Sequence, residues 1–171
     1  AEHASAIDKA VFPGMQGGPI MSAIAAKAVA LHECQQSSFQ SYAKNVIKNS
    51  KALAAGLVAE GMRAISGGTE THLALIDVTG AGVTGKEADE RCGASGITLN
   101  KNSIPFDPNP PAVTSGIRVG TPSTTTQGMG ESEMAVIAKL ITRAIKSDDA
   151  AVHSQIKSEV QELVAKFPIY S

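Results

Sequence analysis

Arg118 is the residue whose type and setting point most directly to ligand binding. It lies in the segment TSGIRVGTP, residues 114–122, where apolar residues flank it on a short predicted strand and glycines bound that strand. An arginine in such a setting is often partly buried, and a buried guanidinium needs an anion. Two partners remain open: an Asp or Glu of the chain, or a ligand carboxylate held by two parallel hydrogen bonds.

A glycine-rich segment, FPGMQGGP at residues 12–19, is a second candidate for anion binding. Its Gly17 and Gly18 come just before a predicted helix that starts near Pro19 or Ile20. Glycines expose backbone N–H groups where the helix dipole favours an anion, so a phosphate is one interpretation of this pattern. A plain tight turn is the other, and the residues alone leave both open.

A third glycine-rich segment matches GxGxxG at Gly80, Gly82 and Gly85, between a predicted strand and a predicted helix. This is the placement that a dinucleotide site requires. However, the acidic residue that should follow the next strand is missing, because the predicted strand at 97–99 leads into Asn100. The match to a dinucleotide site is therefore incomplete.

The same residues also resemble a phosphate-binding P-loop, since Gly80–Lys86 fits GxxxxGK. Glu87 stands where Ser or Thr must ligate magnesium, and its carboxylate would repel a phosphate. Thr84 and Glu87 also have the spacing of a capping box, in which each side chain accepts a hydrogen bond from the other residue's backbone N–H. We therefore expect a structural turn and helix start here, with a nucleotide-binding domain as the alternative.

The other reactive side chains favour no further chemistry. The histidines share no metal-ligand spacing, so we expect no metal site, and no serine lies in a GxSxG context. Cys34 and Cys92 lack CxxC spacing, which predicts unpaired thiols that pack in the interior of a protein from a reducing compartment. The histidines are His3, His32, His72 and His153.

The composition is that of a globular chain without a nucleic-acid or membrane partner. Of its 171 residues 43% are hydrophobic, enough to bury a core. Fifteen basic and sixteen acidic residues nearly cancel and form no long block of one sign, so nothing marks a surface for nucleic acid or anionic lipid. The sequence has no apolar stretch long enough to span a membrane and no signal-peptide pattern, so we expect a cytoplasmic protein. The start, without Met and running at once into a glycine-rich segment, hints at a longer chain entered partway through.

Helices alternate with short strands along the chain, which indicates an α+β or α/β layer fold. A connecting helix at 20–34 has apolar residues at helical spacing and is predicted to be buried against a neighbour. We place a domain boundary near Ser37 and a rigid loop at 104–112, where four prolines fix φ. Two further helices are predicted at 39–58 and 84–96, the first ended by Gly61 and the second by Gly96. The remaining predicted elements are helices at 134–145 and 152–167 and strands at 62–66, 73–78, 97–99 and 117–119.

Five segments in this order, FPGMQGGP, SGGTETHL, TGKEAD, GITLNKNSIPFDP and TSGIRVGTP, resemble the C-terminal half of serine hydroxymethyltransferases. The resemblance runs through essentially the whole chain. It implies the aspartate-aminotransferase type of fold (fold type I), an α/β parent fold whose large domain carries pyridoxal phosphate and whose small C-terminal domain is α+β, a short sheet packed with helices. Residues 1–36 would be the end of the large domain, with the phosphate loop and connecting helix, and residues 37–171 the small domain.

The resemblance also implies an activity, the exchange of a one-carbon unit between serine and tetrahydrofolate to give glycine and 5,10-methylenetetrahydrofolate. Pyridoxal phosphate would act as the electron sink. By motif position, Arg118 would hold the amino-acid carboxylate, in agreement with the bidentate interpretation above. Gly17 and Gly18 would offer backbone N–H groups to the cofactor phosphate of the neighbouring subunit, which implies a homodimer or a higher homo-oligomer.

The folate contacts implied by the resemblance lie between the last two predicted strands. Asn102 would face the folate pocket, and so would the residues just before Val113. Here the sequence departs from the family, because Pro110, Pro111 and Ala112 stand where many relatives have Ser-Pro-Phe.

The resemblance assigns no catalytic residue to this chain. The lysine that binds the cofactor in this family follows a run of threonines and a histidine, but here His72 is followed by Leu73, and Thr126 by Gln127. We therefore expect the missing N-terminal part of the same protein to supply that lysine, and this chain alone to be inactive. The alternative is a non-catalytic folding or assembly fragment.

Overall fold

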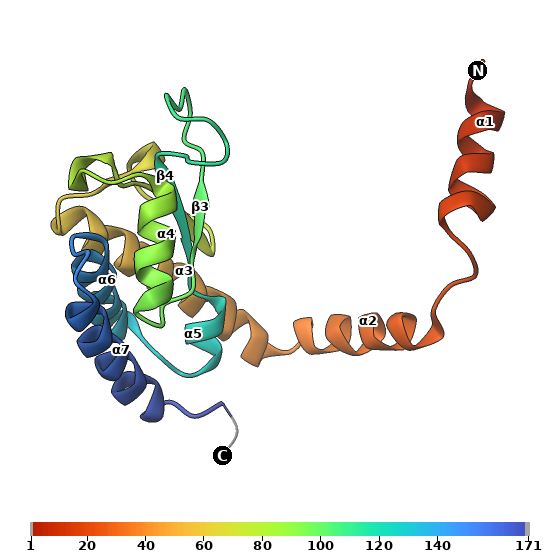
Figure 1. Cartoon of the computed structure of the whole chain (residues 1–171). Coiled ribbons are helices and arrows are strands. Elements are labelled where there is room, and N and C mark those ends of the chain that lie inside the picture. The colour runs from red at the N-terminus through yellow and green to blue at the C-terminus, as the bar shows by residue number, and fades with distance from the viewer. Residues whose placement is uncertain (1, 170–171) are drawn as a thin grey trace. The chain divides into compact units, whose positions relative to one another are not determined.

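The computed structural model describes residues 2–169, which fall into two compact units that divide between Gln40 and Ser41. We call them unit 1 and unit 2 (Figure 1). None of the helices over residues 2–169 is both long enough and apolar enough to cross a membrane. The assignment of residues 1–36 and 37–171 to a large and a small domain stays a prediction.

Unit 1 holds the helices that precede the division. They are α1 (Ala4–Lys9), a π-helical segment (Ala10–Met15) and α2 (Met21–Cys34). The described side chains of residues 2–40 are all exposed, so the expectation that the connecting helix is buried is wrong for this chain by itself. Cys34, expected to pack in the interior, is exposed for the same reason. Apolar residues of α2 are largely exposed to solvent, for example Met21 at 69% and Leu31 at 65%.

Unit 2 is built on a four-stranded antiparallel sheet in the order β1-β2-β4-β3. Its predicted α+β class is confirmed. The strands are β1 (Arg63–Ala64), β2 (Leu73–Asp77), β3 (Asn100–Asn102) and β4 (Gly116–Gly120). The helices are α3 (Ser37–Ala59), which begins before the division, α4 (Gly85–Ala94), α5 (Pro122–Thr126), α6 (Glu131–Ile145) and α7 (Ala150–Ala165), with 3-10 turns at Ile65–Gly67 and Thr79–Ala81.

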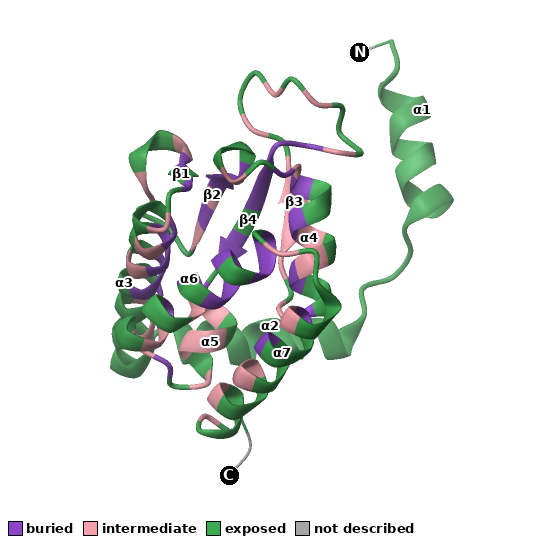
Figure 2. Ribbon diagram, turned by 60° about the vertical axis from the view of Figure 1, so that its left-hand side comes forward, coloured by how far each residue is buried: buried purple, intermediate pink, exposed green. Residues whose placement is uncertain are grey.

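One face of the sheet packs against the helices and forms the core. The alternate residues of β2 and β4 that point this way are buried and join one cluster with side chains of α3, α4, α6 and α7 (Figure 2). They are Ala74, Ile76, Ile117 and Val119. The core therefore fixes which residues of β4 point to the opposite face.

The third strand differs from the prediction at 97–99. Gly96 has a φ of +77°, and the backbone N–H of Ile97 donates to the carbonyl of Cys92 at 2.9 Å, which closes the end of α4. A residue whose N–H caps a helix cannot use it in a strand ladder. Ile97 and Leu99 pack against the core from this turn instead, and pairing with β4 begins at Asn100.

Candidate functional site

The pleat of the sheet brings Arg118, Asn100 and Asn102 to the face opposite the core. Arg118 is exposed while its neighbours Ile117 and Val119 are buried. In the register of β3 and β4, Asn100 lies directly across from Arg118 and Asn102 across from Gly116. Alternate residues of a strand share a face, so the three polar side chains belong to one surface, which we call the open face.

Arg118 has one partner among the described residues. Its Nε donates to Oδ1 of Asn100 at 3.3 Å. No carboxylate within residues 2–169 forms an ion pair with it, which removes the internal Asp or Glu that the sequence left open. The expected partial burial is also wrong, because the side chain is exposed. With Nε held by Asn100, the two terminal nitrogens of the guanidinium remain available to accommodate a carboxylate.

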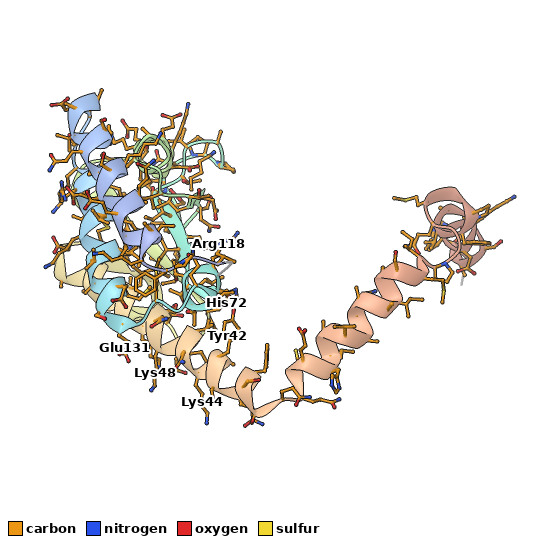
Figure 3. All side chains as sticks on the ribbon, turned by 90° about the horizontal axis from the view of Figure 1, so that it is seen from below. Tyr42, Lys44, Lys48, His72, Arg118 and Glu131 are labelled. Atoms are coloured by element: carbon orange, nitrogen blue, oxygen red, sulfur yellow. The ribbon has the colours of Figure 1, made fainter. Side chains whose placement is uncertain are left out.

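A hollow of about 470 Å³ adjoins Arg118 at the Gly120 end of β4. Arg118 is the only member of its lining that is always charged. Figure 3 shows His72 near Arg118, and both residues line the hollow. A small anionic ligand would meet one fixed positive charge and several polar groups there. The lining residues are His72, Leu73, Thr98, Leu99, Asn100, Arg118 and Gly120.

The loop between β3 and β4, residues 103–115, carries the remaining folate candidates and projects beyond the ends of both strands (Figure 1). Asn102, at the base of this loop, donates from Nδ2 to the carbonyl of Ser103 at 2.8 Å. Pro110, Pro111 and Ala112 are exposed within the loop. Along β4, Asn102's partner Gly116 lies two residues from Arg118, about 7 Å in a strand.

Asp107 organises this loop through hydrogen bonds to both of its carboxylate oxygens. Partial desolvation acts to raise the pKa of this carboxyl. The hydroxyl of Ser115 and the backbone N–H groups of Asn109, Ile104 and Ser115 more than offset that, and together they lower the pKa to about 2. The carboxylate is therefore ionised at neutral pH and acts only as an acceptor.

Gly17 and Gly18 lie in unit 1 between the π-helical segment and α2. A Cβ atom added at either glycine would meet nothing within 4 Å. Neither backbone N–H donates to a protein acceptor within residues 2–169. Both groups are thus open to an external acceptor, which fits a phosphate, although this chain's own atoms do not form a closed cradle around them.

The GxGxxG match is a turn and a helix start, as predicted. The capping box is confirmed: Thr84 N–H donates to Oε2 of Glu87 at 2.7 Å, and Glu87 N–H donates to Oγ1 of Thr84 at 3.2 Å. The next two donors of α4 are also occupied, because the N–H groups of Gly85 and Lys86 donate to carbonyls of the β3–β4 loop at 3.0 and 2.9 Å. No free N–H group of this first turn is left for a phosphate.

Sequence reasoning missed the two residues that hold the candidates in place. The sequence predicts that Asn100 follows the strand at 97–99 and that Asp107 lies in the rigid loop at 104–112, without a role in a site for either residue. The alternation of Asn100 and Asn102 with Lys101 was a signal for the first, and the Asp-Pro-Asn turn pattern at 107–109 for the second.

Comparison with known proteins identifies the family of the chain. The sequence model of the family described as serine hydroxymethyltransferase matches residues 1–141. The chain belongs to this family. The serine hydroxymethyltransferase of Acidobacterium capsulatum is 51% identical over 170 residues, and that of Coprothermobacter proteolyticus 49% over 170 residues; each alignment covers 99% of this chain.

The chain spans 40% of the length of the first relative and 41% of the second. The family identified from the five sequence segments is thereby confirmed, and so is its fold class.

Proposed function

We propose that this chain is part of a pyridoxal-phosphate-dependent serine hydroxymethyltransferase. The complete enzyme, by which we mean this chain together with the part of its relatives' length that it does not span, converts serine and tetrahydrofolate to glycine, 5,10-methylenetetrahydrofolate and water. Membership of the family and about 50% identity to two enzymes of that name support this proposal. The proposal includes a homodimeric enzyme of the cytoplasm.

The observation that carries the proposal is the guanidinium of Arg118, which is held at one nitrogen only. Its Nε is held by Asn100, and no carboxylate within residues 2–169 forms an ion pair with its terminal nitrogens. An amino-acid substrate offers a carboxylate of matching geometry, which can accept two parallel hydrogen bonds. The function of Arg118 is then to bind serine and to fix the angle of the bond that must break, which favours reaction as well as affinity.

Gly17 and Gly18 hold the cofactor phosphate of the neighbouring subunit in this proposal. Their open backbone N–H groups lie a few residues before the start of α2, where the helix dipole favours an anion. When bound, pyridoxal phosphate supplies an electron sink for cleavage between Cα and Cβ of serine. The contribution of this chain is to orient the cofactor through its phosphate.

The folate co-substrate contacts the β3–β4 loop in this proposal, through Asn102 and residues 110–112. Asn102 lies on the open face that carries Arg118, so at this residue the one-carbon donor and acceptor would approach from the same side of the sheet. Pro110, Pro111 and Ala112 offer an apolar surface with few hydrogen-bond donors, suited to contact with a ring more than to polar recognition.

The lysine that attaches to the cofactor belongs to the portion of the enzyme that this chain does not span. The isolated chain should therefore bind no cofactor covalently and should not cleave serine, because nucleophilic catalysis needs the lysine in place. Borohydride reduction of the isolated chain with pyridoxal phosphate, followed by mass spectrometry, checks this. Modification of one specific lysine would contradict this prediction. The alternative, a non-catalytic folding fragment, would be supported if no complete enzyme can be expressed or assembled.

The test of the proposed function is Arg118→Lys in the complete enzyme. Lysine keeps the charge but lacks the planar fork, and each lost charge-assisted hydrogen bond is worth about 1.5 to 3 kcal/mol. The KM for serine should rise roughly ten- to a hundredfold and turnover should fall, with cofactor content unchanged. Unchanged serine kinetics with full cofactor content would overturn the carboxylate role of Arg118, and a wild-type enzyme without the activity would overturn the function.

A further inference from the structure

The β3–β4 loop, residues 103–115, has few ways to stabilise itself. Four of its residues are prolines, which cannot donate backbone hydrogen bonds. Its two ends meet in the sheet, where Asn102 pairs with Gly116, and the residues between them contain no strand or helix. Backbone hydrogen bonds inside the loop form two short turns, from Asp107 N–H to the carbonyl of Ile104 and from the N–H groups of Val113 and Thr114 to that of Pro110. A link between the two halves of the loop therefore depends on side chains.

Asp107 supplies these acceptors and ties the first half of the loop to the second. Its Oδ2 accepts hydrogen bonds from the N–H of Ile104 at 3.0 Å and the N–H of Ser115 at 2.9 Å. Its Oδ1 accepts from the N–H of Asn109 at 2.9 Å and the hydroxyl of Ser115 at 2.6 Å. Ser115 is fully buried at the start of β4, so the carboxylate fastens the loop to the sheet.

The segment that follows is anchored at its far end as well. The carbonyls of Val113 and Thr114 accept hydrogen bonds from Lys86 N–H and Gly85 N–H in the first turn of α4. Residues 110–112 thus lie between two fixed points, Asp107 on one side and α4 on the other. Asn109 Nδ2 also donates to Oγ of Ser115 at 2.9 Å. Without the carboxylate, the α4 anchor, the turn at Pro110 and this single side-chain link would remain.

Phe106, next to Asp107, shows that the loop is held in a conformation its residues do not favour. Its φ is +58°, a region that bulky residues rarely adopt, and its side chain is fully exposed, so burial of the ring does not explain the conformation. Such conformations persist where the surrounding structure over-determines them, and they gather at ligand-binding segments. The four hydrogen bonds to Asp107 provide that surrounding structure.

We propose that Asp107 is a positioning residue for the folate co-substrate, holding residues 110–112 and Asn102 in the arrangement that receives it. This inference rests on the proposed function. Asp107 does not contact the ligand in this view; it acts through the loop. Because Arg118 is held separately by Asn100, serine binding does not depend on this carboxylate.

The experiment is Asp107→Asn in the complete enzyme, with KM measured separately for tetrahydrofolate and for serine. The amide group of asparagine replaces one acceptor oxygen by a donor, so at least one side of the clamp is lost. We expect the KM for tetrahydrofolate to rise about tenfold while the KM for serine and the cofactor content change less than twofold. Ser115→Ala, which removes the hydroxyl that donates to Oδ1 of Asp107 and accepts from Nδ2 of Asn109, leaves the other three hydrogen bonds to the carboxylate in place. It should shift the KM for tetrahydrofolate in the same direction by a smaller factor.

Glu133→Gln is the matched control, because Glu133 also accepts a backbone N–H, from Gly130 at 2.7 Å, but at the start of α6. It should leave both KM values unchanged. If the wild-type enzyme is active, and Asp107→Asn changes both KM values equally or changes neither, the inference is overturned. An inactive wild-type enzyme would overturn the proposed function instead. If Asp107→Asn does not fold, Ser115→Ala decides: a selective rise in the KM for tetrahydrofolate supports the inference, and no selective rise overturns it.

Discussion

Asn100 lies directly opposite Arg118 in the antiparallel pair of β3 and β4, and its amide oxygen accepts the hydrogen bond that Arg118 donates from Nε. An exposed arginine usually samples many rotamers, which costs entropy when it binds a ligand. A cross-strand acceptor at Nε limits that freedom, and within residues 2–169 no carboxylate occupies the terminal nitrogens. Asn100 thus prepares Arg118 to bind a carboxylate.

The first prediction follows from this pair. Asn100→Ala in the complete enzyme should raise the KM for serine about three- to tenfold, because Arg118 must then be ordered at the time of binding. In an Arg118→Lys background the same change should add little, since the Nε that Asn100 holds no longer exists. A double-mutant cycle on serine kinetics measures this coupling. Lys101→Ala, on the other face of β3, is the control and should have no effect on serine; additive effects of Asn100 and Arg118 would contradict the pairing.

The second prediction concerns acid. Hydrogen bonds hold the pKa of Asp107 at about 2, below the ordinary value near 4. Because the pKa is lower in the folded chain, the stability that this carboxylate contributes is fully present above about pH 4 and is lost as the pH falls from about 4 to about 2. Hydrogen exchange of the Ile104 and Ser115 amides should accelerate in that window, and a carbon NMR titration of Asp107 should give its midpoint. A midpoint near 4 would mean that the clamp does not form.

The third prediction concerns the two units. Every described side chain of unit 1 is exposed, so local opening there costs little, whereas unit 2 has a continuous core. Trypsin should cleave the 171-residue chain after Lys9 or Lys27 before it cleaves within residues 41–169. Mass spectrometry of a digestion time course identifies the sites. Early cuts inside unit 2 with unit 1 intact would show that the compact unit has been placed wrongly.

Local sequence patterns predicted local features such as helix ends. They did not predict contacts between residues that are distant in the sequence. Gly61 and Gly96, expected to end helices, have φ of +96° and +77° after α3 and α4, as a helix stop requires. The register that sets Asn100 against Arg118 joins residues 18 apart, so no spacing rule reveals it. The strand expected at 97–99 failed because the N–H of Ile97 has a competing use in the helix cap. Asp107 was likewise visible as a turn residue, but its donors are set by the folded loop.

Gly85 shows how the same glycine can be assigned to a ligand or to packing, and it gives the last prediction. It occupies the last glycine of the GxGxxG match, yet its role in this chain is close contact between α4 and the start of β4. A Cβ atom added there would overlap Oγ1 of Thr114 and the carbonyl oxygen of Gly116. Neither neighbour can withdraw easily, because Thr114 and Gly116 are both buried.

Gly85→Ala should therefore destabilise the chain by about 1 to 3 kcal/mol, the usual cost of overpacking, even though alanine is the better helix former. Gly93→Ala, in the same helix, is the matched control: an added Cβ there meets nothing within 4 Å, so the change should stabilise the chain by about 0.5 to 1 kcal/mol. Urea unfolding of both variants, followed by circular dichroism, compares the two signs directly. Equal stabilisation by both changes would show that α4 does not contact the β3–β4 segment this closely.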